Sequence, residues 1–180
     1  MRQTSGHPIL INGLIYGGII VLIGLLNDGL RLAGVKITDL ATALILTGVI
    51  FLVDLALLFL AGRAASARTG TVGAGALAGL LAGAIAGTVG AVISVTQTVL
   101  DPVAIRDAAV QANPNLDPSQ LTDQAIIATS VFTAVIGLLI LLGVGAGAGA
   151  LGGLLGRQRY QPATHQESLY QGLPPQPPVG

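Results

Sequence analysis

Charged and aromatic side chains are scarce in this sequence, and cysteine does not occur. Only 9% of the 180 residues are charged, whereas soluble domains carry about 25%. The chain therefore lacks the polar surface needed to cover a soluble globule of its size. Without cysteine it forms no disulfide and no thiol-based metal site. The two histidines, His7 and His165, lie near opposite ends of the chain and do not have metal-ligand spacing.

Other missing features disfavour several classes of function. The formal net charge is zero, which argues against nucleic-acid binding because that needs a concentrated basic surface. The sequence has no H-E-x-x-H, no G-x-x-x-x-G-K-[ST] and no acidic pair within an apolar segment. We expect no catalytic site, no cofactor and no metal. Seven of the eight basic residues are Arg, which together with the abundant Ala and Gly favours a bacterial source.

Long apolar runs make up most of the chain, with 52% apolar residues and a mean hydropathy of +0.80. A bilayer core needs roughly 20 apolar residues of helix, and four segments qualify: residues 8–26, 40–61, 71–95 and 125–155. The sequence predicts an all-α membrane protein, an antiparallel four-helix transmembrane bundle over residues 1–157. The first segment is interpreted as an uncleaved signal anchor rather than a cleaved signal peptide, because it is longer than a usual h-region.

Basic residues near the segment ends predict the orientation of the bundle. If all four segments cross the membrane, most basic residues lie on one side: Arg2, Arg63, Arg68, Arg157 and Arg159. Arg31, Lys36 and Arg106 lie on the other side. Because cytoplasmic loops carry the excess of Lys and Arg, we expect both termini in the cytoplasm and the protein in the cell (inner/plasma) membrane.

The third connection, residues 96–124, carries two helix-start signals. An Asp-Pro pair at 101–102 supplies an N-cap and a first helical residue, which predicts a short outer-side helix over residues 101–112. A second Asp-Pro pair at 117–118, followed by Gln120, predicts a helix that begins at residue 118 and continues unbroken into the fourth segment. The short helix then either lies against that projecting helix as a cap or stays solvated without a partner.

The last segment, residues 158–180, is rich in Gln and Pro. This composition predicts a flexible cytoplasmic tail, since it cannot build a packed core. Pro174 and Pro177 have the PxxP spacing that aromatic grooves bind. The favoured interpretation is a tail without a partner.

Glycine recurs at every fourth position in the third segment, and similar rows occur elsewhere. The rows are Gly75, Gly79, Gly83 and Gly87 in the third segment, Gly145, Gly149 and Gly153 in the fourth, and Gly13 and Gly17 in the first. The second segment has Gly48 alone. Residues four apart share a helix face, and small residues let helices approach closely in lipid. This predicts glycine-zipper packing with the third segment central, the first and fourth against it and the second facing lipid. Alternatively, the stripe faces another subunit.

The run Gly143-x-Gly145-x-Gly147-x-Gly149 is similar to the glycine row of rotary-ATPase proteolipid subunits, in which tightly packed helices build a ring. The resemblance implies close helix packing and a membrane carboxylate on the helix after the row. No acidic residue follows the run in the fourth segment, and the third connection is longer than the short hairpins of that family. We interpret the likeness as convergent packing chemistry and assign no family.

Asp54 is the only ionisable residue inside a predicted span. An Asp at a helix centre costs about 2.5–3.5 kcal/mol on insertion scales, which makes it a functional candidate. Asn12 and Tyr16 share a face of the first segment at a similar depth, so either could hydrogen-bond the carboxyl group. Asp54 either binds a proton or cation during transport or ties two helices together. The tie is favoured, because no second acid, His or Lys accompanies it.

Six hydroxyl side chains gather in the outer halves of the third and fourth segments: Ser94, Thr96, Thr98, Thr129, Ser130 and Thr133. Such side chains often hydrogen-bond the backbone of their own helix, and this is the favoured interpretation. The alternative is a polar vestibule that opens outward.

These features predict a non-catalytic structural or accessory membrane subunit that acts through its glycine-rich faces. Its expected partners are the lipid bilayer and either further copies of itself or a larger membrane complex. The alternative is a small transporter or channel component that uses Asp54.

Overall fold

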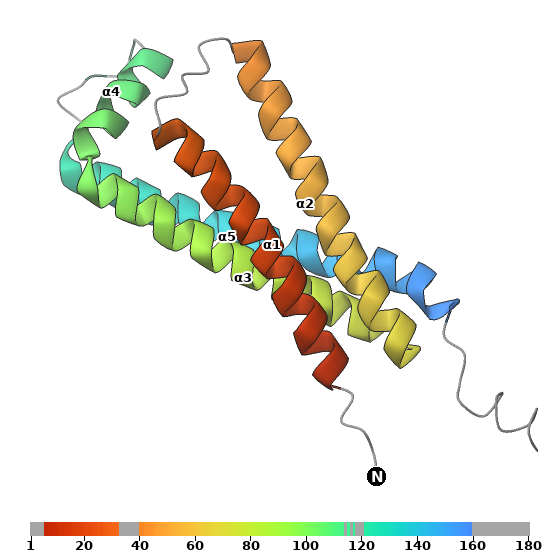
Figure 1. Cartoon of the computed structure of the whole chain (residues 1–180). Helices are drawn as coiled ribbons and strands as arrows, with labels where there is room; N and C mark the ends of the chain where they lie inside the picture. Colours follow the sequence, from red (N-terminus) through yellow and green to blue (C-terminus); the bar gives the residue numbers. More distant parts are fainter. Residues whose placement is uncertain (1–5, 33–39, 114, 116, 118–120, 160–180) are drawn as a thin grey trace, which may run out of the picture.

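The structure, a computed structural model, describes residues 6–32, 40–113, 115, 117 and 121–159, and most of these residues are helical. Those residues contain no strand. The five helices are α1 (Gly6–Leu32), α2 (Leu40–Thr69), α3 (Val72–Leu100), α4 (Pro102–Ala112) and α5 (Asp123–Arg157) (Figure 1). The predicted tail beyond residue 159, with its PxxP spacing, and the predicted helix start at residue 118 lie outside the described residues.

Four of these helices, α1, α2, α3 and α5, are long and apolar enough to cross a membrane. Each extends past the apolar segment that hydropathy marks, since Ala, Ser, Arg and Gln continue a helix without strong penalty. The largest extension is in α2, which passes the predicted end at residue 61 and continues to Thr69. The extra turns of α2 belong to the packed part of the molecule, because Ala65 and Ser66 are completely buried.

Helix α3 lies at the centre and contacts α1, α2 and α5. Its most extensive contact is with α5, and the two helices run side by side in Figure 1. Helix α1 lies across α3, while α2 meets α5 and α3 in its C-terminal half and diverges toward its N-terminal end (Figure 1). The buried apolar cluster reflects this crossing, because it unites Ile20 of α1, Leu58 of α2, Ala82 of α3 and Ala148 of α5.

A tight turn joins α2 to α3 and fixes the end of the bundle that we call the turn end. Gly70 adopts a positive φ of 71° and donates its N–H to the carbonyl of Ser66 over 2.8 Å. This is a left-handed helix stop, which glycine allows without a Cβ penalty. The Ser66 hydroxyl donates to the carbonyl of Thr71 over 2.8 Å. Both bonds hold the start of α3 against the end of α2.

The opposite end, which we call the α4 end, carries the short helix α4 and the start of α5. Asp101 caps α4 by accepting the N–H of Ala104 over 3.1 Å, with Pro102 at the first helical position. The prediction of an unbroken helix from residue 118 is wrong, because Leu121 is not helical and α5 begins at Asp123. Thr122 is the N-cap instead, and its hydroxyl accepts the N–H of Ala125 over 3.2 Å.

Helix α5 is nevertheless much longer than a membrane span. Its 35 residues extend about 52 Å at 1.5 Å per residue, against a hydrocarbon core of about 30 Å. Helix α5 therefore exceeds the thickness of a bilayer core, and its first residues contact α4.

Candidate functional site

At the turn end, α5 meets its neighbours backbone to backbone through glycine. A Cβ added at Gly145 would lie 2.5 Å from the carbonyl oxygen of Gly79, and one at Gly149 would lie 2.5 Å from that of Gly75. Real Cβ atoms essentially never approach another atom this closely. A Cβ at Gly79 would overlap the carbonyl of Gly145. Only glycine fits these positions on either helix, and we call this contact the α3–α5 seam.

The seam ends part-way along α3. Gly83 still faces backbone, since a Cβ there would lie 2.6 Å from the carbonyl oxygen of Leu141. At Gly87 the nearest atom belongs instead to the side chain of Leu138, and at Gly90 nothing lies within 4 Å. Beyond Gly87, side chains therefore replace backbone between the two helices.

A second glycine contact joins α5 to α2, in addition to the contacts that the glycine rows predict. A Cβ at Gly152 would overlap the carbonyl of Phe59, one at Gly156 that of Arg63, and one at Gly62 that of Gly149. The expectation that the second segment faces lipid is wrong for its C-terminal half. Hydropathy ended the segment at residue 61 and so left out the next glycine, Gly62. Gly48, by contrast, has nothing within 4 Å.

Helix α1 approaches α3 less closely than α5 does. A Cβ at Gly17 would lie 3.1 Å from the Cα and carbonyl oxygen of Ala82. At Gly13 a Cβ would lie 2.6 Å from Cδ2 and 2.9 Å from Cβ of Leu81, so the neighbour there is a side chain rather than backbone. The remaining predicted row member, Gly153, is buried on α5, where a Cβ would lie 2.8 Å from the Ser66 hydroxyl.

Asp54 lies on α2 with one carboxylate oxygen, Oδ1, buried and without a hydrogen-bond partner among the described residues. The bond expected from Asn12 is not formed. Asn12 is buried on α1 and donates its amide to the carbonyl of Pro8 over 2.7 Å, within its own helix. Tyr16 packs against the apolar cluster around Leu58. The three residues are thus on neighbouring helices, but no hydrogen bond joins them.

At the α4 end, hydroxyl side chains line a cavity of about 350 Å³ between α3, α4 and α5. Five of the six predicted hydroxyls lie on its wall: Ser94, Thr98, Thr129, Ser130 and Thr133. The sixth, Thr96, lies in a separate groove of about 380 Å³ on the same two long helices. The hydroxyls are therefore divided between two hollows.

Of these six hydroxyls, one donates a hydrogen bond to a backbone carbonyl of its own helix. Thr98 donates to the carbonyl of Ser94 over 3.0 Å, and its oxygen lies 2.9 Å from the Ser130 hydroxyl. Because Thr98 has a single hydroxyl proton, Ser130 is the donor in the second bond. The hydroxyls of Ser94, Thr129 and Thr133 have no hydrogen-bond partner among the described residues, and all three residues are exposed. Their polar atoms are free to bind a ligand or water.

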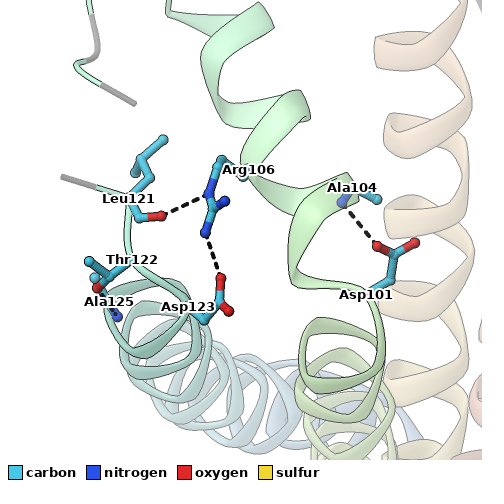
Figure 2. A network of polar contacts seen from close by, with 7 residues as sticks. All are labelled: Asp101, Ala104, Arg106, Leu121, Thr122, Asp123 and Ala125. Carbon is cyan, nitrogen blue, oxygen red and sulfur yellow. Dashed lines mark hydrogen bonds and ion pairs between the residues drawn. The ribbon is translucent and has the colours of Figure 1, made fainter. Parts of the chain in front are cut away.

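Arg106 fastens α4 over the start of α5. Figure 2 shows its guanidinium between the two segments, where Nε donates to the carbonyl of Leu121 over 2.8 Å and Nη2 pairs with Asp123 over 2.5 Å. The planar guanidinium of Arg106, which has five N–H donors, thus binds both the carbonyl of Leu121 and the carboxylate of Asp123. Sequence reasoning missed this residue because its partners lie 15 and 17 positions away.

Among the described residues, no group of three or more His, Cys, Asp or Glu side chains could hold a metal ion. Comparisons of the chain with family models, with curated proteins and with solved structures found no match.

Proposed function

We propose that the protein is a non-catalytic structural or accessory subunit of a membrane assembly, built as an antiparallel four-helix transmembrane bundle with glycine-zipper packing. One observation carries the proposal: α2 is packed at its C-terminal half but bare at its N-terminal half. Leu58 is 1% exposed, whereas Leu44 and Leu52 are each 64% exposed. Every residue in the stretch from Leu44 to Val49 whose burial is described is exposed, on all sides of the helix. This stretch is available to a helix of another subunit.

The α3–α5 seam also supports a role as a structural subunit. The glycine rows of α3 and α5 face each other within one chain, so the α3–α5 seam is not available to a second subunit. Other glycines of α5, Gly143 and Gly147, have nothing within 4 Å of a built Cβ and lie on an exposed face. A subunit of this kind presents a fixed core and open apolar faces to its surroundings.

The test exploits the absence of cysteine, since a single introduced thiol has no background. Leu52→Cys should crosslink to a second polypeptide in native membranes when a thiol-reactive bifunctional reagent is added. Leu58→Cys, six residues further along the same helix, is the matched control and should not crosslink because Leu58 is buried. Blue-native electrophoresis should show a complex larger than the 18.0 kDa chain. A monomer without crosslinks at Leu52 would overturn the proposal.

A second candidate is a small transporter or channel component that uses Asp54. The observation that favours it is the buried and unpaired Oδ1 of that residue. Asp54→Asn replaces the carboxylate by an isosteric amide. The variant should abolish ion flux in reconstituted vesicles if this role is right, and leave assembly unchanged. A homo-oligomer with Asp54-dependent flux would favour this candidate over the first.

The proposed orientation places both termini in the cytoplasm and the turn end on the cytoplasmic side of the cell (inner/plasma) membrane. Arg63, Arg68 and Arg157 support it, because they lie near the ends of α2 and α5, whereas Arg106 lies at the α4 end. Basic residues concentrate on the cytoplasmic side. A phosphatase fused after Arg159 should be inactive, and activity there would reverse the orientation.

A further inference from the structure

The cavity at the α4 end has the size and boundary of a binding site. Its volume of about 350 Å³ lies within the range of about 300–1,000 Å³ typical of small-molecule sites. It lies on the same two long helices beyond the point where backbone contact ends, since at Gly87 the nearest neighbour is already the side chain of Leu138. Small side chains such as Ser94 and Ala125 then leave the space unfilled.

The walls of this cavity have two kinds of surface. One is formed by hydroxyls, with Ser94, Thr129 and Thr133 unpaired among the described residues. The other is apolar and includes Ile105 of α4, Leu121 and Ile126. Among the residues that the structure describes, no charged side chain lines the cavity. This lining favours an uncharged molecule, with hydrogen-bonding groups on one part and an apolar body on the other.

The depth of the hydroxyls matches the edge of a bilayer. Gly156 of α5 lies against Arg63 of α2, which marks the polar boundary at the turn end. Counting roughly 20 residues from Gly156 across the hydrocarbon core puts the opposite boundary near residue 136 of α5. Thr133 lies within one turn of that point. The apolar wall continues beyond it toward α4, where Ile105 is still 42% exposed.

We propose that this cavity binds an uncharged amphiphile from the membrane surface, of the monoacylglycerol class. Its glycerol hydroxyls bond to Ser94, Thr129 and Thr133 at the edge of the hydrocarbon core. Its chain turns away from the bilayer and lies against the apolar wall beneath α4. Arg106 holds α4 in place above the chain through Leu121 and Asp123. The site takes a neutral ligand because no described residue on its wall is charged, and the nearby guanidinium of Arg106 is already paired with Asp123.

The test is photocrosslinking of the full chain in phosphatidylcholine vesicles, with a medium-chain monoacylglycerol that carries a diazirine. Labelled peptides should map to α4 and the first turns of α5. Ala125→Phe should fill the cavity and reduce labelling about tenfold, while Thr129→Val with Thr133→Val should reduce it about fivefold through lost hydrogen bonds. Ala134→Phe is the matched control, because Ala134 lies on the same helix but lines the separate groove that contains Thr96.

Each outcome decides the proposal. Normal labelling of Ala134→Phe together with weak labelling of Ala125→Phe supports it, provided that both variants melt like the natural chain. Equal labelling of all variants, or labels that map to α1 or α2, would overturn the site. Equal capture of a diazirine fatty acid, whose carboxylate is charged, would overturn its preference for an uncharged ligand.

Discussion

Helices α3 and α5 pack against each other differently at the two ends of the bundle. At the turn end, glycine carbonyls and Cα atoms of α3 and α5 meet directly, and α2 joins them through Gly152 and Gly156. At the α4 end, the same two long helices are separated by side chains, linked by the hydrogen bond between Thr98 and Ser130, and hollowed by a cavity. At both ends the contact is between α3 and α5, two long and largely apolar helices. Where the positions that face the other helix are glycine, the two backbones meet in a rigid seam. Where these positions carry a Cβ atom, space for a ligand is left between the helices.

The largest expected effect comes from adding side chains inside the α3–α5 seam. Gly79→Leu with Gly83→Leu should prevent the bundle from forming, because the new atoms meet the carbonyls of Gly145 and Leu141, which cannot move aside like a side chain. Overpacking costs about 1–3 kcal/mol per site, and two sites approach the total stability of about 5–15 kcal/mol of a typical protein. Thermal unfolding in detergent and the yield of monodisperse protein measure the loss.

The control for this pair has the same chemistry on an open face. Gly143→Leu with Gly147→Leu places two leucines four residues apart on α5, where nothing lies within 4 Å. This variant should fold normally. If both pairs melt alike, the turn end is no more closely packed than the rest, and the contrast between the two ends fails.

Two glycine-to-alanine changes on α5 distinguish the effect of close packing on stability from the effect of helix propensity. Gly152→Ala should destabilise the chain by about 1–3 kcal/mol, since its methyl group overlaps the carbonyl of Phe59. Gly147→Ala should instead be neutral or stabilising by up to about 1 kcal/mol, because alanine favours a helix and the site is open. Unfolding midpoints of the two variants should shift in opposite directions. A matching shift in both would assign the effect to propensity alone.

The sequence predicts the spans and the glycine rows more readily than the contacts at either end. Period-four glycines such as Gly79 and Gly145 are visible without a structure, because helix geometry alone puts them on one face. The role of Gly62 was not visible, since hydropathy ended the second segment one residue earlier. Which hydroxyls share a cavity depends on how α3 and α5 are aligned, and no periodicity encodes that alignment.

A hydrogen-bond partner for Asp54 likewise could not be predicted from the sequence. Depth and helix face suggested Asn12 as a partner, yet the Asn12 amide bonds the carbonyl of Pro8 in its own helix. Asparagine side chains compete for nearby backbone groups, and this local option prevails over a bond across helices. A pairing inferred from depth alone therefore needs the rotation of both helices before it can be predicted.

At the α4 end, Thr98→Val tests how much a side-chain link contributes where no seam exists. The isosteric change removes the bonds to Ser130 and to the carbonyl of Ser94. Hydrogen bonds between membrane helices average about 0.6 kcal/mol, so the midpoint should fall only slightly. A double-mutant cycle with Ser130→Ala measures the coupling directly. A coupling above about 2 kcal/mol would make this end as tightly tied as the turn end.

The smallest effect on global stability, but the clearest local one, is expected from Arg106→Gln. The guanidinium joins α4 to Leu121 and Asp123 (Figure 2), and its partner Asp123 is 62% exposed. Exposed ion pairs contribute about 0.2–1 kcal/mol, so thermal unfolding should hardly change. Helix α4 has few other contacts with α3 and α5, so its amide hydrogens should exchange faster once Arg106 is gone. Asp107→Asn, which removes a charge one position along α4 and breaks no bond to α5, serves as the control. Unchanged exchange in Arg106→Gln would mean that apolar contact alone holds α4 in place. The α4 end would then be a fixed part of the fold, with the same rigidity as the seam at the turn end.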